Sequence, residues 1–344
     1  MVVNEKTLQA VKPLREAFAG VTVLITGATG MIGQNLVALL LAMNDELNTH
    51  MHLVAHARNK AKADKLFKMY SDRADFEVVI SDVKELKVER SVDYMIHTAG
   101  VTGGSKQHID FPMRTISTAL DGTKNVLDLA VEKKCKGVVY LSSLEVYGNS
   151  GLLSKDIYET DGGYIDPTNV RSSYSESKRM CECMCASYTK QFGIPTYIAR
   201  LTATFGYGVT YTDNRVFAQF ARSVIEKKDI VLKSTGETVR NYCDAEDAAT
   251  AILMLLVRGT AGQAYNIANM ETDISIKDLA EKFIEGFPES NISLKFDLKE
   301  DAAKLGYNGI MRNVLNSEKL MSLGWKPIFS MQDMIKRLVD TMSM

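Results

Sequence analysis

Long apolar runs are absent from this sequence of 344 residues. The longest is the stretch LVALLLAM at 36–43, whereas a transmembrane helix needs roughly 20 apolar residues in succession. The N-terminal segment 1–18, MVVNEKTLQAVKPLREAF, mixes acids and bases without an apolar centre, which argues against a signal peptide. We therefore expect no membrane partner and a cytoplasmic location, with residues 1–20 forming a helical N-terminal extension.

An excess of charge of either sign is also lacking. The sequence has 41 lysines and arginines against 42 aspartates and glutamates, so its formal net charge is −1. Proteins that bind nucleic acids over a wide surface need clustered positive charge. The charge balance therefore predicts that nucleic acid is not a partner.

Cysteine is scarce, and its five copies are too few and too irregularly spaced for a disulfide framework. Cys181, Cys183 and Cys185 form a CxCxC cluster on a predicted helix. A spacing of two directs neighbouring side chains to different faces of a helix. We interpret them as buried or half-buried thiols and predict no metal site.

Strand and helix signals alternate through the first 200 residues. Apolar strands of this kind, separated by helices, predict a Rossmann-type doubly wound parallel sheet of the α/β class, covered by helices on both faces. The predicted strands are 21–26, 51–57, 76–80, 92–97, 137–143 and 196–201, and the predicted helices are 31–43, 60–70, 112–133 and 174–192.

The pattern of predicted secondary structure changes after residue 202, where helices and strands become shorter and loops more frequent. Helices 215–227 and 245–257 and strands 264–269 and 292–296 are predicted there, with a largely helical C-terminus. We expect an NAD(P)-binding Rossmann domain over 21–202. Residues 203–344 are expected to form mainly a smaller substrate-binding α/β cap, with segments around 240–268 returning to the first domain. Neither Pro nor Gly accumulates at a linker, so the two parts are expected to form one unit.

A glycine-rich turn, TGATGMIG at 26–33, joins the first strand to the first helix. In this context the first two glycines allow a tight turn and close approach by a pyrophosphate, and the third lets the helix pack near the strand. The free N–H groups and the dipole at the helix start favour phosphate. The turn therefore predicts a dinucleotide site. Its predicted cofactor contacts are Gly27, Thr29, Gly30, Met31, Ile32 and Gly33.

The end of the second strand indicates which dinucleotide is bound. An acidic residue there would bond the ribose hydroxyls of NAD, but the sequence reads Ala57, Arg58 and Asn59. Arg58 is suited to a 2′-phosphate, and it is equally suited to stacking on adenine. NAD and NADP therefore both stay open, with Arg58 and Asn59 as predicted cofactor contacts.

The stretch SSYSESKR at 172–179 places Tyr174 and Lys178 four residues apart on a predicted helix. With 14 tyrosines in the chain, such a pair also arises by chance. Upstream, YLSSLEVYG at 140–148 brings Ser143 to the end of a central strand, where folds of this class bind ligands. A hydroxyl, a phenol and an ammonium are therefore predicted to converge near the nicotinamide.

Together these motifs resemble the extended short-chain dehydrogenase/reductase family, in its nucleotide-sugar epimerase, dehydratase and decarboxylase branch. The resemblance runs from about residue 20 over nearly the whole chain, and it is strongest to UDP-glucuronate decarboxylases. HTAG at 97–100, GTKNVLDLA at 122–130 and RNYCDAEDAA at 240–249 carry it further.

The resemblance implies roles for individual residues and a nucleotide-diphosphate sugar as substrate. It implies a homodimer, paired through helices 112–133 and 174–192. Implied catalytic residues are Ser143, Glu145, Tyr174 and Lys178. Implied cofactor contacts are Asp82, Val83, Thr98, Ala99, Gly100, Tyr174 and Lys178. Implied substrate contacts are Thr102, Ser143, Arg215 and Arg240.

In this chemistry Tyr174 takes the proton of the sugar C4 hydroxyl, Ser143 holds the C4 oxygen, and Lys178 also binds the nicotinamide ribose. Lowering the pKa of a tyrosine from roughly 10 to about 7 requires about 4 kcal/mol of phenolate stabilisation. Lys178 and the positive nicotinamide ring are expected to supply it in a partly dry site.

The step that follows C4 oxidation is less well defined. Dehydratases of this family resemble Thr-Asp-Glu where this chain reads Ser143-Leu144-Glu145, which favours a decarboxylase-like over a 4,6-dehydratase-like lyase. A 4-epimerase, an NADPH-dependent 4-ketosugar reductase and a non-catalytic nucleotide-binding regulator stay open. Ala119 and Ala203 stand where the family usually has asparagine, which leaves the substrate contacts undefined.

Overall fold

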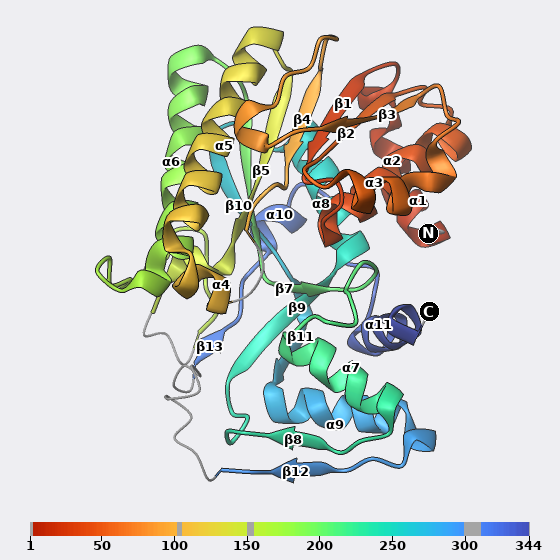
Figure 1. Cartoon of the computed structure of the whole chain (residues 1–344), viewed down its shortest axis with the longest axis vertical. Coiled ribbons are helices and arrows are strands. Elements are labelled where there is room, and N and C mark those ends of the chain that lie inside the picture. The colour runs from red at the N-terminus through yellow and green to blue at the C-terminus, as the bar shows by residue number, and fades with distance from the viewer. Residues whose placement is uncertain (1–2, 102–104, 150–154, 299–310, 344) are drawn as a thin grey trace.

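Seven parallel strands form the centre of the larger lobe in the computed structural model, which describes residues 3–101, 105–149, 155–298 and 311–343 (Figure 1). Their order is β10-β6-β5-β4-β1-β2-β3. After β3 the chain returns to the other side of β1, which creates the switch point where such sheets bind ligands. The strands are β1 (Thr22–Thr26), β2 (His52–Ala57), β3 (Phe76–Ile80), β4 (Tyr94–His97), β5 (Gly137–Ser143), β6 (Thr196–Leu201) and β10 (Gln263–Ile267).

Helices cover both faces of this sheet, which confirms the predicted fold class. All five residues of β1 are buried, as expected for a strand covered on both sides. One apolar cluster joins the sheet to α2 and α8, and a second joins its other face to α5 and α6. The helices of this lobe are α1 (Glu5–Val11), α2 (Met31–Leu47), α3 (Lys60–Phe67), α4 (Ser105–Asp110), α5 (Pro112–Lys133), α6 (Ser173–Phe192), α8 (Ala245–Arg258) and α10 (Glu318–Met321).

The smaller lobe lies beyond the end of the sheet at which α2 begins. Gly208 lies against Met31 at the start of α2, and the Asn35 side chain donates to the Tyr207 carbonyl at 2.9 Å. The smaller lobe has an apolar core of its own, which includes Phe205, Phe217 and Phe283. The elements of this lobe are β7 (Ala203–Phe205), β8 (Ile230–Leu232), β9 (Val239–Asp244), β11 (Asn269–Ser275), β12 (Leu294–Phe296), β13 (Arg312–Asn313), α7 (Val216–Glu226), α9 (Ile276–Gly286) and α11 (Met331–Ser343).

Among the described residues, no helix has the length and apolarity needed to span a bilayer. The structure places Cys181 and Cys185 in the apolar core between α6 and the sheet, whereas Cys183 is exposed. The described residues hold no cluster of three or more metal-ligating side chains.

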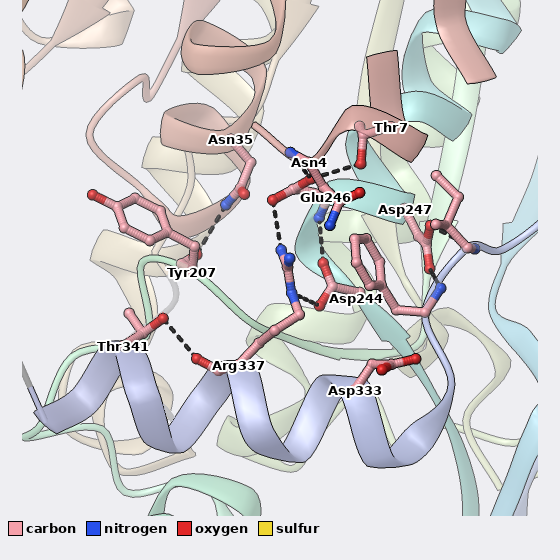
Figure 2. A network of polar contacts seen from close by, with 12 residues as sticks. Asn4, Thr7, Asn35, Tyr207, Asp244, Glu246, Asp247, Asp333, Arg337 and Thr341 are labelled. Carbon is pink, nitrogen blue, oxygen red and sulfur yellow. Dashed lines mark hydrogen bonds and ion pairs between the residues drawn. The ribbon is translucent and has the colours of Figure 1, made fainter. Parts of the chain in front are cut away.

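A buried cluster of charges joins the two lobes and both ends of the described chain (Figure 2). Asp244 and Glu246, at the start of α8, are 0% and 2% exposed. Arg337 of α11 pairs with both, its Nε lying 3.3 Å from Asp244 Oδ2 and its Nη2 reaching Glu246 Oε1. From α1, the Thr7 hydroxyl donates to Glu246 Oε2 at 2.6 Å. α1, α8 and α11 are thus fixed to one another by a single arginine and its two acids.

Replacing Arg337 by glutamine is expected to destabilise the fold by about 3 kcal/mol, because removing one partner leaves buried carboxylates without a cation. Denaturant unfolding should show this as a lower midpoint. Lys336→Gln removes the neighbouring, exposed charge and should leave the midpoint unchanged. Equal effects of the two substitutions would show that burial of the pair does not matter.

Candidate active site

The turn between β1 and α2 is packed so closely that glycine is required at two positions. Gly27 has φ of +67°, and a Cβ there would lie 2.8 Å from the Ala99 backbone. A Cβ on Gly33 would lie 2.4 Å from the Gly27 carbonyl oxygen. α2 begins after Gly30 without a side-chain cap, so its first N–H groups are open to an anion. This turn therefore fits a pyrophosphate.

The remaining predicted contacts of the turn differ in exposure. Thr29 and Met31 are half-buried at its rim, whereas the Ile32 side chain is buried in the core. The Thr29 carbonyl accepts from the Gln34 side chain at 3.0 Å. Thr29 is partly accessible at the turn, Met31 packs in part against the apolar cores of both lobes, and only the backbone N–H of Ile32 is available to a ligand.

The ends of β3 and β4 border the same turn. The Thr98 hydroxyl donates to the Thr26 carbonyl at 2.7 Å, and the Ala99 N–H donates to the Thr26 hydroxyl at 3.3 Å. A Cβ on Gly100 would meet no atom of the described residues within 4 Å. Asp82 accepts from the Lys84 N–H at 3.0 Å, and Val83 packs against Gly122 of α5. The Val83 side chain therefore supports the core instead of lining the cleft.

At the end of β2, Arg58 and Asn59 are both exposed. Asn59 caps α3, because its side chain accepts from the Lys62 N–H at 2.9 Å. Arg58 forms no ion pair or side-chain hydrogen bond within the described part of the chain and is free to meet an adenosine group.

Tyr174, Lys178 and Ser143 converge where α6 crosses the end of β5. Tyr174 is half-buried, and the Ser143 side chain lies close enough to lower the pKa of its phenol. The Lys178 ammonium donates to the Leu141 carbonyl at 2.6 Å and lies 5.8 Å from the centre of the Tyr174 ring. The structure thus brings together the three residues that the sequence analysis singled out.

Burial shifts the pKa values of Tyr174 and Lys178 in opposite directions. It raises the pKa of Tyr174, and the Glu145 carboxylate adds to this, while the Ser143 hydrogen bond and the Arg215 charge oppose it. Burial also lowers the pKa of Lys178 to about 8. Because a dry site disfavours both charged forms, the chain alone keeps Tyr174 protonated. The expected stabilisation of the Tyr174 phenolate therefore depends on the positive nicotinamide ring as well as on Lys178.

His108 and Thr115 are site residues that the sequence analysis missed. The His108 ring stacks on the Tyr174 ring, with centroids 4.6 Å apart, and its Nδ1 contacts the Thr115 hydroxyl at 3.1 Å. His108 stands on α4, whose six residues give too short a pattern to predict from sequence. A cavity beside these residues is lined by Ala99, Gly100, Val101, Thr115, Ala119, Thr123, Tyr140, Tyr174, Ser177 and Lys178.

The predicted substrate residues differ in their burial and in their partners. Glu145 pairs with Arg171 at 3.5 Å. Arg215 is exposed and holds Asp213 at 2.6 Å. Arg240, on β9, has a buried Nε without a hydrogen-bond partner in the described residues. Thr102 lies outside the described residues.

The fold and the glycine turn define a dinucleotide-binding α/β enzyme, and comparison with known proteins narrows the class. Residues 23–268 match the profile described as NAD dependent epimerase/dehydratase family. The chain belongs to that family, as the sequence resemblance implied. The family's dependence on NAD agrees with the predicted cofactor.

Individual relatives are similar to this chain in sequence, and solved structures are similar to it in fold. The chain is 28% identical over 331 residues to UDP-glucuronic acid decarboxylase 2 of Arabidopsis thaliana, covering 95% of this chain and 69% of that protein. It is 25% identical over 328 residues to dTDP-D-glucose 4,6-dehydratase of Homo sapiens, covering 92% and 89%. Its fold matches the dTDP-glucose 4,6-dehydratase DesIV of Streptomyces venezuelae, with a TM-score of 0.76 and 21% identity over 93% of this chain and 96% of that chain. It also matches a UDP-N-acetylglucosamine 4-epimerase of Methanobrevibacter ruminantium M1, with a TM-score of 0.79 and 18% identity over 94% and 98%.

Gly33→Ala is expected to weaken NAD binding at least tenfold and to destabilise the protein by roughly 1–3 kcal/mol, because overpacking forces the helix away from the turn. Calorimetric titration with NAD and denaturant unfolding measure the two effects. Gly162→Ala is the control, since its new Cβ would meet no atom within 4 Å. Unchanged NAD affinity in Gly33→Ala would contradict the assigned cradle.

Proposed function

We propose that the chain acts on a nucleotide-diphosphate sugar through transient oxidation at C4, and that it is a lyase of decarboxylase-like or 4,6-dehydratase-like type. The observation that carries the proposal is that Tyr174 and Lys178 line a cavity beside the end of β4, with Ser143 close to Tyr174. Relatives named for UDP-glucuronic acid and for dTDP-D-glucose support this class of substrate.

NAD, when bound, supplies the hydride acceptor and a positively charged ring. The glycine turn and the start of α2 would hold its phosphates, and Lys178 would hold its ribose. Tyr174 would take the C4 hydroxyl proton, while Ser143 holds that oxygen through its hydroxyl. The Tyr174 phenolate is favoured only when positive charge lies nearby, because burial raises the pKa of this residue.

The substrate diphosphate is assigned to Arg240 and Arg215. The unpartnered, buried Nε of Arg240 is a donor suited to phosphate oxygens. Arg215 is held by Asp213, and its charge acts on Tyr174, which supports a role for it in holding the substrate.

Leu144 favours decarboxylation over dehydration. It stands between Ser143 and Glu145 and packs against a small apolar cluster that includes Val146 and Tyr147. Only one carboxylate, that of Glu145, is therefore available in this segment, whereas dehydration needs both an acid and a base. Loss of carbon dioxide from a 4-keto sugar acid needs no such pair.

A second candidate is an NADPH-dependent 4-ketosugar reductase, favoured by the exposed Arg58 at the end of β2. A 4-epimerase would use the same Tyr174 and Lys178 without releasing a group. A nucleotide-binding regulator would have no use for the convergence of all three catalytic groups.

Incubation with a panel of UDP- and dTDP-sugars, followed by mass spectrometry, tests the reaction. We expect loss of carbon dioxide from UDP-glucuronate; loss of water would indicate a dehydratase, and an isomer of unchanged mass an epimerase. Tyr174→Phe should lower turnover by roughly a thousandfold, since general acid–base groups contribute 10²–10⁴-fold. Tyr158→Phe, an exposed tyrosine, is the control. Turnover retained by Tyr174→Phe would contradict the proposal.

We also propose a homodimer paired through α5 and α6. Both helices lie on the outer side of the sheet (Figure 1), and they expose Met113 and Met180 at 68% and 52%. Met180→Lys is expected to shift the protein from dimer to monomer in sedimentation velocity, because it places a charge in an apolar contact. Met69→Lys alters another exposed methionine, outside these helices, and should leave the dimer intact. A monomeric unsubstituted protein would refute the pairing.

A further inference from the structure

Three residues of α6, each four positions from the next, hold three successive residues of β5. Tyr174 lies close to Ser143 and interacts with its side chain, Lys178 donates to the Leu141 carbonyl, and the Ser142 hydroxyl donates to Glu182 Oε1. Positions i, i+4 and i+8 lie along one face of a helix. Two of these residues belong to the proposed chemistry, whereas Glu182 has no role assigned so far.

Glu182 is a buried carboxylate, 8% exposed, that is held from two sides. Arg200 of β6 clamps it, with Nε 3.0 Å from Oε1 and Nη2 2.7 Å from Oε2. Arg200 stands opposite Ser142 in the ladder between β5 and β6, so arginine, glutamate and serine form one closed group.

Arg200 also reaches the loop that follows β5. Its Nη1 donates to the Tyr147 hydroxyl and to the Glu159 carbonyl, each at 2.9 Å. A buried ion pair of this kind is a weak source of stability, since desolvation offsets the attraction. Its position, directly behind Ser143 and one turn beyond Lys178, instead points to a role in the site.

We propose that Glu182, clamped by Arg200, is a positioning residue of the active site. Its carboxylate fixes the strand end that carries Ser143, and its negative charge, one helical turn beyond Lys178, favours the protonated ammonium. The inference rests on the proposed function for its effect on turnover, but its effect on Lys178 can be measured without any substrate.

The charges around Lys178 support this role. Burial lowers its pKa to about 8, while Cys181 and Glu182 act to raise it. Without Glu182 the ammonium would lose its proton at a lower pH, and Arg200 would be left as an unpaired cation nearby. The titratable and charged groups facing Lys178 and Glu182 are His97, His108, Tyr140, Tyr147, Tyr174, Cys181, Cys185 and Arg200.

Competitive acetylation across a pH series, with peptide mass spectrometry, measures the titration of Lys178 in the absence of turnover. Glu182→Gln is expected to lower the pKa of Lys178 by about one unit, which is a tenfold loss of proton affinity. The double variant Glu182→Gln, Arg200→Gln removes both buried charges and so protects the fold. Its Lys178 pKa is expected to shift in the same direction, but by less. Glu132→Gln, an exposed acid near the end of α5, is the control and should cause no shift.

The same variants are then assayed with the substrate that the panel identifies. Activity requires the charged ammonium, so the basic limb of kcat/KM should move to lower pH in Glu182→Gln, with activity partly recovered below the new limb. A Lys178 titration and a basic limb that both match the unsubstituted protein, in variants that fold and bind NAD, would overturn the proposal. If no sugar nucleotide is turned over, the proposed function fails while the Lys178 titration still decides on Glu182.

Discussion

Partial burial of Tyr174 and Lys178, where α6 crosses the end of β5, is the constraint on which the proposed chemistry depends. The same burial that strengthens every charge interaction in this region also disfavours the charged forms of Tyr174 and Lys178. The acids of the region are accordingly matched with arginines, Glu145 with Arg171 and Glu182 with Arg200. In such a site the protonation of a group depends strongly on the charges placed beside it.

Much of the larger lobe could be predicted because its elements carry strong local signals. β5 and α5 have the predicted bounds, since a strand buried on both faces reads as an apolar run and a helix of 22 residues repeats its pattern many times. The glycine turn was predictable for a different reason, because only glycine fits where φ is positive and backbones nearly touch. Tyr174 and Lys178 were found through their spacing on one helix.

The parts that sequence reasoning missed depend on long-range contacts or on short elements. β7 and β13, with three and two residues, exist only because β9 lies between distant segments of the chain. His108 reaches Tyr174 only because α4 packs against α6, and no local pattern records that contact. Arg200 and Glu182 lie in different elements, so their pairing becomes visible only in three dimensions. Ala119, by contrast, was noted as a departure, and it lines the cavity beside Lys178.

The charge cluster around Arg337 has a consequence for how the chain is made. Glu246 and Arg337 are 91 positions apart, so during synthesis the acids of α8 leave the ribosome well before their cation does. Until α11 emerges, these carboxylates cannot be buried without loss of stabilisation, and the contact between α1 and α8 stays incomplete. The pairing of α8 with α11 can therefore form only after the helix that carries Arg337 has emerged.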